Sequence, residues 1–158
     1  MDKKTQIIAV AGKGGVGKTS LAGVTVKLLV ESFPDKKILA IDADPAVGLS
    51  TVLNVDVDKT IDDIRKEVIK NVEGGDTKTA VELLGEAKYE IMDAVVEQDG
   101  YAFIAIGRPE TAGCYCKINS YLKEVITMLS DKFDYVVIDG EAGIEQINRR
   151  VMEKVTHL

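Results

Sequence analysis

A glycine-rich segment near the start of this chain constrains its fold more than any other feature. Residues 9–20 read AVAGKGGVGKTS and match the pattern G-x-x-x-x-G-K-[ST] at Gly12, Gly17, Lys18 and Thr19. A strand is predicted directly before the segment and a helix directly after it, which is the context in which this pattern binds phosphate. The segment therefore predicts a phosphate-binding loop, or P-loop. A glycine-rich turn without a ligand is the weaker interpretation, because it does not explain this placement.

The chemistry of the P-loop follows from its residue types. Glycines leave the backbone N–H groups of residues 14–19 free to point at phosphate oxygens, and the N-terminus of the next helix adds the positive end of its dipole. Lys18 is expected to contact the β- and γ-phosphates, and Thr19 is expected to bind Mg²⁺. ATP and Mg²⁺ are thus the expected ligands. The residues of this loop expected to bind them are Gly12, Lys13, Gly14, Gly15, Val16, Gly17, Lys18, Thr19 and Ser20.

Four short apolar runs are typical of buried parallel strands. They span residues 6–12, 37–44, 102–107 and 135–140, are rich in Ile, Val and Ala, and each end in Gly or Asp. Continuous apolar runs of this length, separated by helical patterns, indicate a parallel sheet that is covered on both faces. The alternation of strands and helices predicts a doubly wound α/β fold with a mainly parallel sheet.

Helical patterns lie between the predicted strands and after the last one. Thr60 precedes one of them, and its hydroxyl is expected to cap that helix together with Asp63. The last helix should lead back to another strand, but the sequence ends at THL. We therefore expect a single domain, residues 1–158, that lacks the C-terminal strands of a larger fold. The predicted helices span residues 17–31, 61–71, about 77–97, 118–129 and 144–155.

The length and charge balance of the chain exclude several classes of protein. At 158 residues, the chain is long enough for one compact domain with a sizeable core. Its 20 basic and 26 acidic residues give a net charge of −6 without a basic cluster, which disfavours binding to nucleic acid or to an anionic membrane. No secretory signal, membrane span or disulfide framework is evident. We expect a cytoplasmic protein.

Acidic residues follow two of the predicted strands. Asp42 and Asp44 end the run KILAIDAD, and Asp139 ends the run YVVID. Ligand sites of open α/β sheets lie at the carboxyl ends of the strands. A carboxylate after four apolar residues rarely serves the core unless it is paired or bound to a cation. These three side chains are therefore candidates for the nucleotide site, and a strand-ending turn is the alternative interpretation of DADP.

The loop and these carboxylates resemble those of the deviant P-loop ATPases, a class of nucleotide-driven dimers that includes the nitrogenase iron protein and the MinD and ParA proteins. The likeness rests on GKGGVGKT, DADP and YVVIDG. The resemblance implies that Lys13 is a catalytic residue that reaches across a dimer to the partner's nucleotide, and that Asp44 positions or activates the attacking water. It also implies that Asp42 lies nearby and that Asp139, the Walker B aspartate, holds the Mg²⁺ shell.

The two cysteines of the chain, Cys114 and Cys116, lie one residue apart. In an extended loop both side chains would point to one side, and two thiolates would supply half of the tetrahedral shell of Zn²⁺, Cu⁺ or Ni²⁺. The economical source of the other half is the same pair in a second subunit, because the only histidine, His157, lies near the end of the sequence. Two buried small residues are the alternative, and a disulfide across one residue would be strained.

A narrower resemblance includes both cysteines. The blocks GRPETAGCYCKINSYLKEVI, residues 107–126, and FDYVVIDGEAGIEQINRR, residues 133–150, are similar to those of the carbon monoxide dehydrogenase accessory ATPases of the CooC type. With the P-loop and DADP, the similarity covers nearly the whole chain. It implies a homodimer that closes on ATP or metal, a Ni²⁺ or Zn²⁺ ion bound by Cys114 and Cys116 of both subunits, and carbon monoxide dehydrogenase as the client.

Two other functions share the same kind of P-loop. One is an electron-transfer reductase like the nitrogenase iron protein, in which an iron–sulfur cluster bridges the dimer. Such families place their cysteines on two separate segments. The other is a positioning ATPase of the MinD or ParA type, which should carry a basic amphipathic terminal helix or a basic patch. The last predicted helix carries Glu145 and Glu153 beside its basic residues, so we rank this function below metal insertion.

Overall fold

The computed structural model describes residues 4–72, 87–107, 124, 127–140 and 156–157. Within these ranges the strands form a five-stranded sheet in the order β1-β5-β2-β4-β3, parallel except between β3 and β4. The predicted doubly wound α/β fold with a mainly parallel sheet is confirmed. The strands are β1 (Gln6–Val10), β2 (Ile38–Asp42), β3 (Val96–Gln98), β4 (Tyr101–Ala105) and β5 (Tyr135–Asp139). The helices are α1 (Lys18–Ser32), α2 (Gly48–Leu53), α3 (Ile61–Val72) and α5 (Lys88–Asp93).

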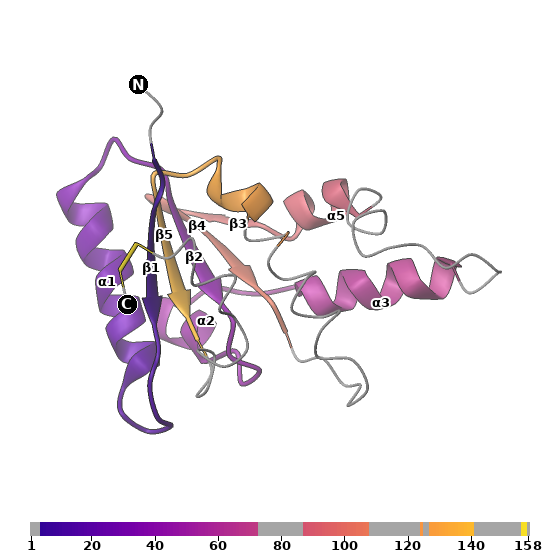
Figure 1. The fold of residues 1–158 in the computed structure, drawn as a ribbon, viewed down its shortest axis with the longest axis horizontal. Coiled ribbons are helices and arrows are strands. Elements are labelled where there is room, and N and C mark those ends of the chain that lie inside the picture. Colours follow the sequence, from indigo (N-terminus) through magenta and orange to yellow (C-terminus); the bar gives the residue numbers. More distant parts are fainter. Residues whose placement is uncertain (1–3, 73–86, 108–123, 125–126, 141–155, 158) are drawn as a thin grey trace.

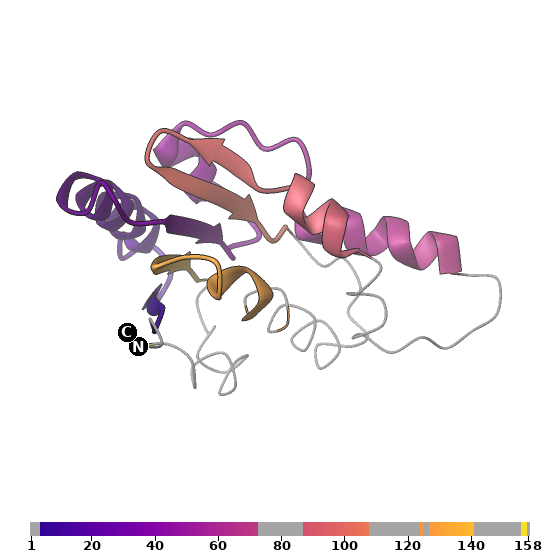
Figure 2. The same cartoon turned by 90° about the horizontal axis from the view of Figure 1, so that it is seen from above.

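Helices cover both faces of the sheet (Figures 1 and 2). On one face, Leu49 of α2 belongs to the same apolar cluster as Phe103 of β4, together with buried residues of α1. On the other face, Ile64 of α3 and Ile91 of α5 share a cluster with Ile104 of β4. Phe103 and Ile104 are neighbours in one strand, so alternate side chains enter opposite layers. The sheet is therefore buried on both sides, as its continuous apolar runs predict.

The four predicted strands are confirmed as β1, β2, β4 and β5, and their register places their carboxyl ends level. Val10 of β1 pairs with Asp139 of β5, Asp139 pairs with Asp42 of β2, and Asp42 pairs with Ala105 of β4. Paired residues of parallel strands point to the same face of a sheet. The Asp42 and Asp139 side chains therefore lie side by side on the face that α1 and α2 cover.

The predicted helix over about 77–97 is wrong in its last part. Helix α5 ends at Asp93, and Val96–Gln98 form β3, which pairs antiparallel with β4. Asp99 and Gly100 make the two-residue turn of this hairpin, and Gly100 has a positive φ of 86°. An Asp-Gly pair between strand-forming residues is a strong hairpin signal, and here it outweighs the helical pattern. The first part of that prediction, residues 73–86, lies outside the described residues.

The other predicted helices differ in how far the structure describes them. The helices over 17–31 and 61–71 are confirmed as α1 and α3. Within the predicted helix over 118–129, the described residues 124 and 127–129 are helical. The predicted helix over 144–155 lies outside the described residues. Helix α2 has no counterpart among the predictions, because its 6 residues are too few to show a periodic pattern.

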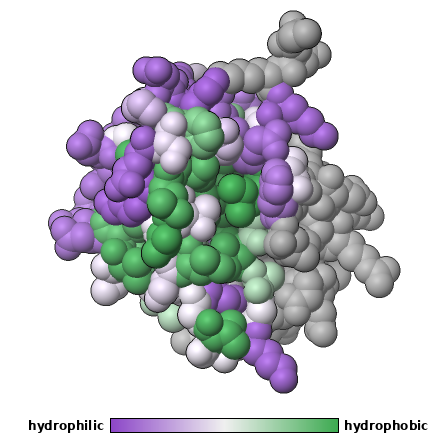
Figure 3. Space-filling view, turned by 90° about the vertical axis from the view of Figure 1, so that its left-hand side faces the viewer, coloured by the Kyte–Doolittle hydropathy of each residue, from purple (hydrophilic) through white to green (hydrophobic). Residues whose placement is uncertain are grey.

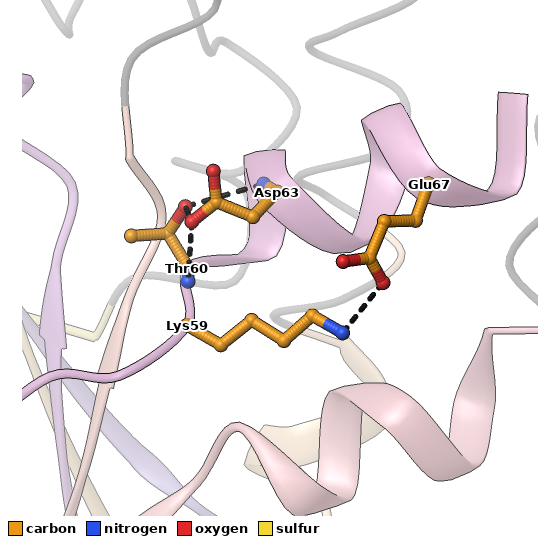
Figure 4. Close-up of polar contacts among 4 residues, drawn as sticks. All are labelled: Lys59, Thr60, Asp63 and Glu67. Atoms are coloured by element: carbon orange, nitrogen blue, oxygen red, sulfur yellow. Dashed lines mark hydrogen bonds and ion pairs between the residues drawn. The ribbon is translucent and has the colours of Figure 1, made fainter. Parts of the chain in front are cut away.

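The predicted cap of α3 is confirmed (Figure 4). The backbone N–H of Asp63 donates to Thr60 Oγ1 at 3.2 Å, and the backbone N–H of Thr60 donates to Asp63 Oδ2 at 2.9 Å. This reciprocal pair satisfies N–H groups that the start of a helix leaves free. The Thr60 hydroxyl and N–H lower the pKa of Asp63. Beside the cap, Lys59 Nζ and Glu67 Oε2 form an exposed ion pair at 2.6 Å.

Residues 156–157 return to the edge of β1 (Figure 1). The N–H of Thr156 donates to the carbonyl oxygen of Ile7 at 2.8 Å, and the N–H of Ala9 donates to the carbonyl oxygen of His157 at 2.9 Å. The segment runs parallel to β1. These two residues thus pair with the edge of the sheet, although we expected the sequence to end before it reached another strand.

The outer face of α1 is apolar (Figure 3). Leu21, Val24 and Leu28 are 58%, 54% and 56% exposed and lie along one side of the helix. Val52 of α2 packs close to the backbone of α1 at Gly23, where a Cβ atom would lie 2.6 Å from Val52 Cγ1. Glycine at this position therefore permits the two helices to approach closely. Among the described residues, no helix combines the length and apolarity needed to cross a bilayer.

Replacing Thr60 with alanine should destabilise the protein. The change removes the hydroxyl that accepts from Asp63, so we expect the free energy of unfolding at pH 7 to fall by about 1 kcal/mol. The loss should shrink as the pH falls through the lowered pKa of Asp63, because the Thr60 hydroxyl also donates to this carboxylate at 2.6 Å, and that bond weakens once the carboxylate is protonated. Urea unfolding measures both effects. Thr60→Ser keeps the hydroxyl and is the matched control; equal stability of Thr60→Ala and wild type would contradict the prediction.

Candidate functional site

The P-loop connects β1 to α1 at the carboxyl edge of the sheet. Gly15 and Gly17 have positive φ angles of 78° and 91°, a left-handed backbone that side chains disfavour. Gly17 is the N-cap residue of α1, and no side-chain hydrogen bond caps this helix end. A Cβ atom at Gly14, Gly15 or Gly17 would meet no atom within 4 Å. The backbone of the loop is therefore accessible, and the first N–H groups of α1 remain available to an anion.

The two lysines of the P-loop occupy different environments. Lys18 is the first residue of α1, and only 9% of it is exposed. Its Nζ donates to the carbonyl oxygen of Lys13 at 2.8 Å, so the ammonium group lies within the loop. Lys13 itself is exposed. One lysine can therefore serve a phosphate held by the loop, while the side chain of the other faces outward.

Asp139 is a buried carboxylate beside the P-loop. Its exposed fraction is 0%, and neither of its oxygens has a hydrogen-bond partner among the described residues. Burial raises its pKa, and the charge of Asp44 adds to the rise. Thr19 and Lys18 lie near enough to lower the pKa in part, although the Thr19 hydroxyl makes no well-formed hydrogen bond to it. The predicted site residues Asp139, Asp44, Thr19 and Lys18 therefore lie close together.

The residues around Asp139 fit a magnesium ion. Mg²⁺ prefers oxygen ligands, keeps several waters and commonly binds through one or two protein groups together with phosphate oxygens. The Asp139 oxygens, which no described residue hydrogen-bonds, and the Thr19 hydroxyl are oxygen ligands of this kind. The described residues hold no group of three or more His, Cys, Asp or Glu side chains that could bind a metal by themselves. The arrangement thus suits a cation that is bound partly by these protein groups and partly by the phosphates of a nucleotide.

Asp42 is also fully buried, but its oxygens are used within the protein. Oδ1 accepts the backbone N–H of Asp44 at 3.2 Å, and Oδ2 accepts the backbone N–H of Leu49, in the first turn of α2, at 2.9 Å. Burial raises the pKa of Asp42 to about 6, and the Asp139 carboxylate adds to the rise while the N–H donors oppose it. Asp42 thus joins β2 to the start of α2.

Residues 43–48, which we call the Asp44 loop, connect β2 to α2 across the P-loop. Asp44 Oδ1 accepts the N–H of Ala46 at 2.8 Å, and the Asp44 carbonyl oxygen accepts the N–H of Val47 at 2.9 Å. A Cβ atom on Gly48 would lie 3.5 Å from Thr19 Cγ2, so this end of the loop lies against the P-loop. The loop therefore brings Asp44 close to Lys18, Thr19 and Asp139.

The structure gathers most of the predicted site residues at one edge of the sheet. The P-loop residues, Asp42, Asp44 and Asp139 all lie there, whereas Cys114 and Cys116 fall outside the described residues. Sequence reasoning missed the role of α2, whose first turn binds Asp42. No local pattern marks that contact, because it joins residues 7 positions apart through a loop.

Comparison with known families gives one match over most of the chain. The family described as anion-transporting ATPase (ArsA_ATPase) matches residues 5–143. The uncharacterized ATP-binding protein MJ0685 of Methanocaldococcus jannaschii is 42% identical over 149 residues, which are 94% of this chain and 58% of that protein. The carbon monoxide dehydrogenase accessory protein CooC of Rhodospirillum rubrum is 28% identical over 157 residues, covering 94% and 59%. The chain thus spans less than two thirds of these relatives.

Solved structures share the fold. The septum site-determining protein MinD of Pyrococcus horikoshii, complexed with Mg-ADP, is 26% identical, with a TM-score of 0.57 over 96% of this chain and 55% of that one. A ParA family ATPase from Chlorobium tepidum is 19% identical, with a TM-score of 0.63 over 96% and 57%. The second likeness concerns the fold alone. The chain thus shares the MinD and ParA architecture.

Replacing Asp139 with asparagine should stabilise the ligand-free protein. A folded-state pKa above the unfolded value of about 4 means that the stability from this group is full below that pH and is lost as the pH rises through the folded pKa. Asparagine does not ionise, so Asp139→Asn should raise the free energy of unfolding at pH 7 by about 1 kcal/mol or more. The gain should shrink toward pH 4.

Urea unfolding without nucleotide or Mg²⁺ measures this gain. Asp134→Asn is the matched control, because that carboxylate accepts the N–H of Lys37 at 2.8 Å at the opposite end of the sheet. The control variant should not gain stability. An Asp139→Asn variant that is no more stable than wild type at pH 7 would sink the interpretation of Asp139 as an unpaired buried charge.

Proposed function

This chain belongs to the anion-transporting ATPase family and has the fold of MinD and ParA proteins, and from that premise we propose that it binds Mg-ATP at the P-loop and hydrolyses it as a homodimer. The observation that carries the proposal is the buried Asp139 carboxylate beside Thr19 and Lys18, which has no hydrogen-bond partner among the described residues. A loop that can bind phosphate beside a carboxylate that can bind a cation suits a nucleotide whose phosphates also bind Mg²⁺. A protein that bound an anion alone would not need the buried acid.

Each group near the loop has a proposed role. The N–H groups of the P-loop and the Lys18 ammonium hold the phosphates, as expected of this motif. Thr19 and Asp139 would hold Mg²⁺, which when bound neutralises phosphate charge. Asp44 orients the attacking water and accepts a proton from it. Lys13, which is exposed, would reach the nucleotide of the partner subunit.

Two lysine variants separate nucleotide binding from hydrolysis. Lys18→Ala removes a charge-assisted hydrogen bond to the phosphates, so the affinity for ATP should fall about tenfold or more. Lys13→Ala should keep the affinity for ATP but lose most of the hydrolysis, because its role belongs to the closed dimer. A fluorescent ATP analogue reports binding, and phosphate release reports turnover. Lys36→Ala, on the segment between α1 and β2, is the control. Wild-type ATP binding in Lys18→Ala would contradict the proposal.

The biological role that we propose for this ATPase is the insertion of metal into a client enzyme. Cys114 and Cys116 of two subunits would together bind Ni²⁺ or Zn²⁺, and the client would be carbon monoxide dehydrogenase. Support comes from the Cys-x-Cys pattern and from the relative named as an accessory protein of that enzyme. ATP would draw two subunits together, and hydrolysis would let them separate. Such coupling requires the metal affinity to differ between the open and closed forms.

Metal titration of the reduced protein tests this role. We expect one Ni²⁺ or Zn²⁺ per dimer, bound more tightly with Mg-ATP than without it, and loss of tight binding in Cys114→Ser and Cys116→Ser at unchanged ATP affinity. Ser120→Ala, a few residues away, is the control. Tight binding that survives in the cysteine variants would rule out this site. Iron–sulfur absorption of the anaerobically purified protein would instead favour an electron-transfer reductase.

A further inference from the structure

The contacts of Asp42 point to a task other than binding a ligand. This carboxylate is 0% exposed, and its two oxygens accept the N–H groups of Asp44 and Leu49. Those donors lie at opposite ends of the Asp44 loop. A single side chain on the rigid end of β2 therefore ties both ends of the loop that carries the proposed catalytic aspartate.

The Asp44 loop is strained where it enters α2. Val47 has a φ of 51° and lies in the left-handed region, although it is β-branched and is the N-cap residue of the helix. Such a residue is costly in this conformation and persists only where surrounding contacts enforce it. Hydrogen bonds hold Val47 on both sides: its N–H donates to the Asp44 carbonyl oxygen, and its carbonyl oxygen accepts the Ser50 hydroxyl. The Asp42 bond to Leu49 fixes the backbone two residues later. The strained backbone of Val47 favours a change of the loop, and the hydrogen bonds of Asp42 oppose that change.

The other side of the loop lies on the nucleotide site. Gly48 lies against Thr19, and Asp44 is near enough to Asp139 to affect its pKa. A loop released from Asp42 could move α2 and Asp44 away from the P-loop without unfolding the sheet. The position of Asp44, rather than the P-loop itself, would then be what changes.

We propose that Asp42 is a positioning residue that holds the strained Asp44 loop over the P-loop and thereby sets the rate of hydrolysis without binding the nucleotide. This inference rests on the proposed ATPase function. Asp42 would affect hydrolysis at that site through its hydrogen bonds to Asp44 and Leu49. A carboxylate is required because it offers two acceptor oxygens, whereas an amide offers one acceptor and a donor that would face an N–H group.

Asp42→Asn should therefore change the rate and not the affinity. We expect kcat to fall about tenfold or more, because a displaced group loses the alignment that catalysis needs, while the affinity for ATP stays within about twofold of wild type. Adding Val47→Gly should restore part of kcat, because glycine adopts the left-handed backbone without strain. Asp134→Asn, an aspartate that accepts one backbone N–H far from the site, is the control and should keep wild-type kcat.

Amide hydrogen exchange tests the same inference without nucleotide. In Asp42→Asn the Leu49 amide should exchange about tenfold faster or more, while amides of β5 stay protected. Unchanged exchange at Leu49, or a fall in ATP affinity that matches the fall in kcat, would overturn the positioning role. If the wild-type protein does not hydrolyse ATP, the proposed function fails instead, and the exchange of Leu49 still decides whether Asp42 holds the loop.

Discussion

The buried carboxylate of Asp139, which has no hydrogen-bond partner in the part of the chain that the structure describes, is the constraint on which the rest of the site depends. Parallel pairing with β1 and β2 fixes it at the carboxyl edge of the sheet, directly beside Asp42. A charge without a partner in such a place is costly unless a proton or a cation neutralises it. Thr19 of α1 and Asp44 after β2 add oxygen atoms around it, while the Lys18 ammonium group lies in the adjoining loop. The register of the strands, the start of α1 and the Asp44 loop thus meet at the proposed cation site.

The Asp44 loop, like Asp139, contains features that lower the stability of the protein. Val47 adopts a backbone that a β-branched residue disfavours, and Asp42 is ionised only against the cost of burial. Strain and unpaired charge gather at functional sites because the surrounding structure can hold them there. In this chain the hydrogen bonds of Asp42 and the apolar packing of α1 and α2 on the sheet hold the loop together. The geometry of the site therefore depends on contacts that lie outside it.

The sequence predicts those parts of the molecule that have local signals. Apolar runs mark the four long strands, the glycine spacing marks the P-loop, and Thr60 with Asp63 marks the start of α3. Helical periodicity misled where the Asp99-Gly100 turn forms a hairpin. The contact of Asp42 with Leu49 could not be predicted, because it depends on how a short loop folds back rather than on residue type. The place of Asp139 at the carboxyl end of a strand was predictable, but its lack of a hydrogen-bond partner within the described residues was not.

We propose that the P-loop binds the phosphates of a nucleotide and that Asp139 binds the same nucleotide through its Mg²⁺ ion. The most direct measurement is the affinity of ATP for wild type and Asp139→Asn, each in Mg²⁺ and in EDTA. We expect Mg²⁺ to strengthen ATP binding to wild type and this gain to be lost in Asp139→Asn. In EDTA the two proteins should bind ATP similarly. An equal gain from Mg²⁺ in both proteins would contradict this proposal.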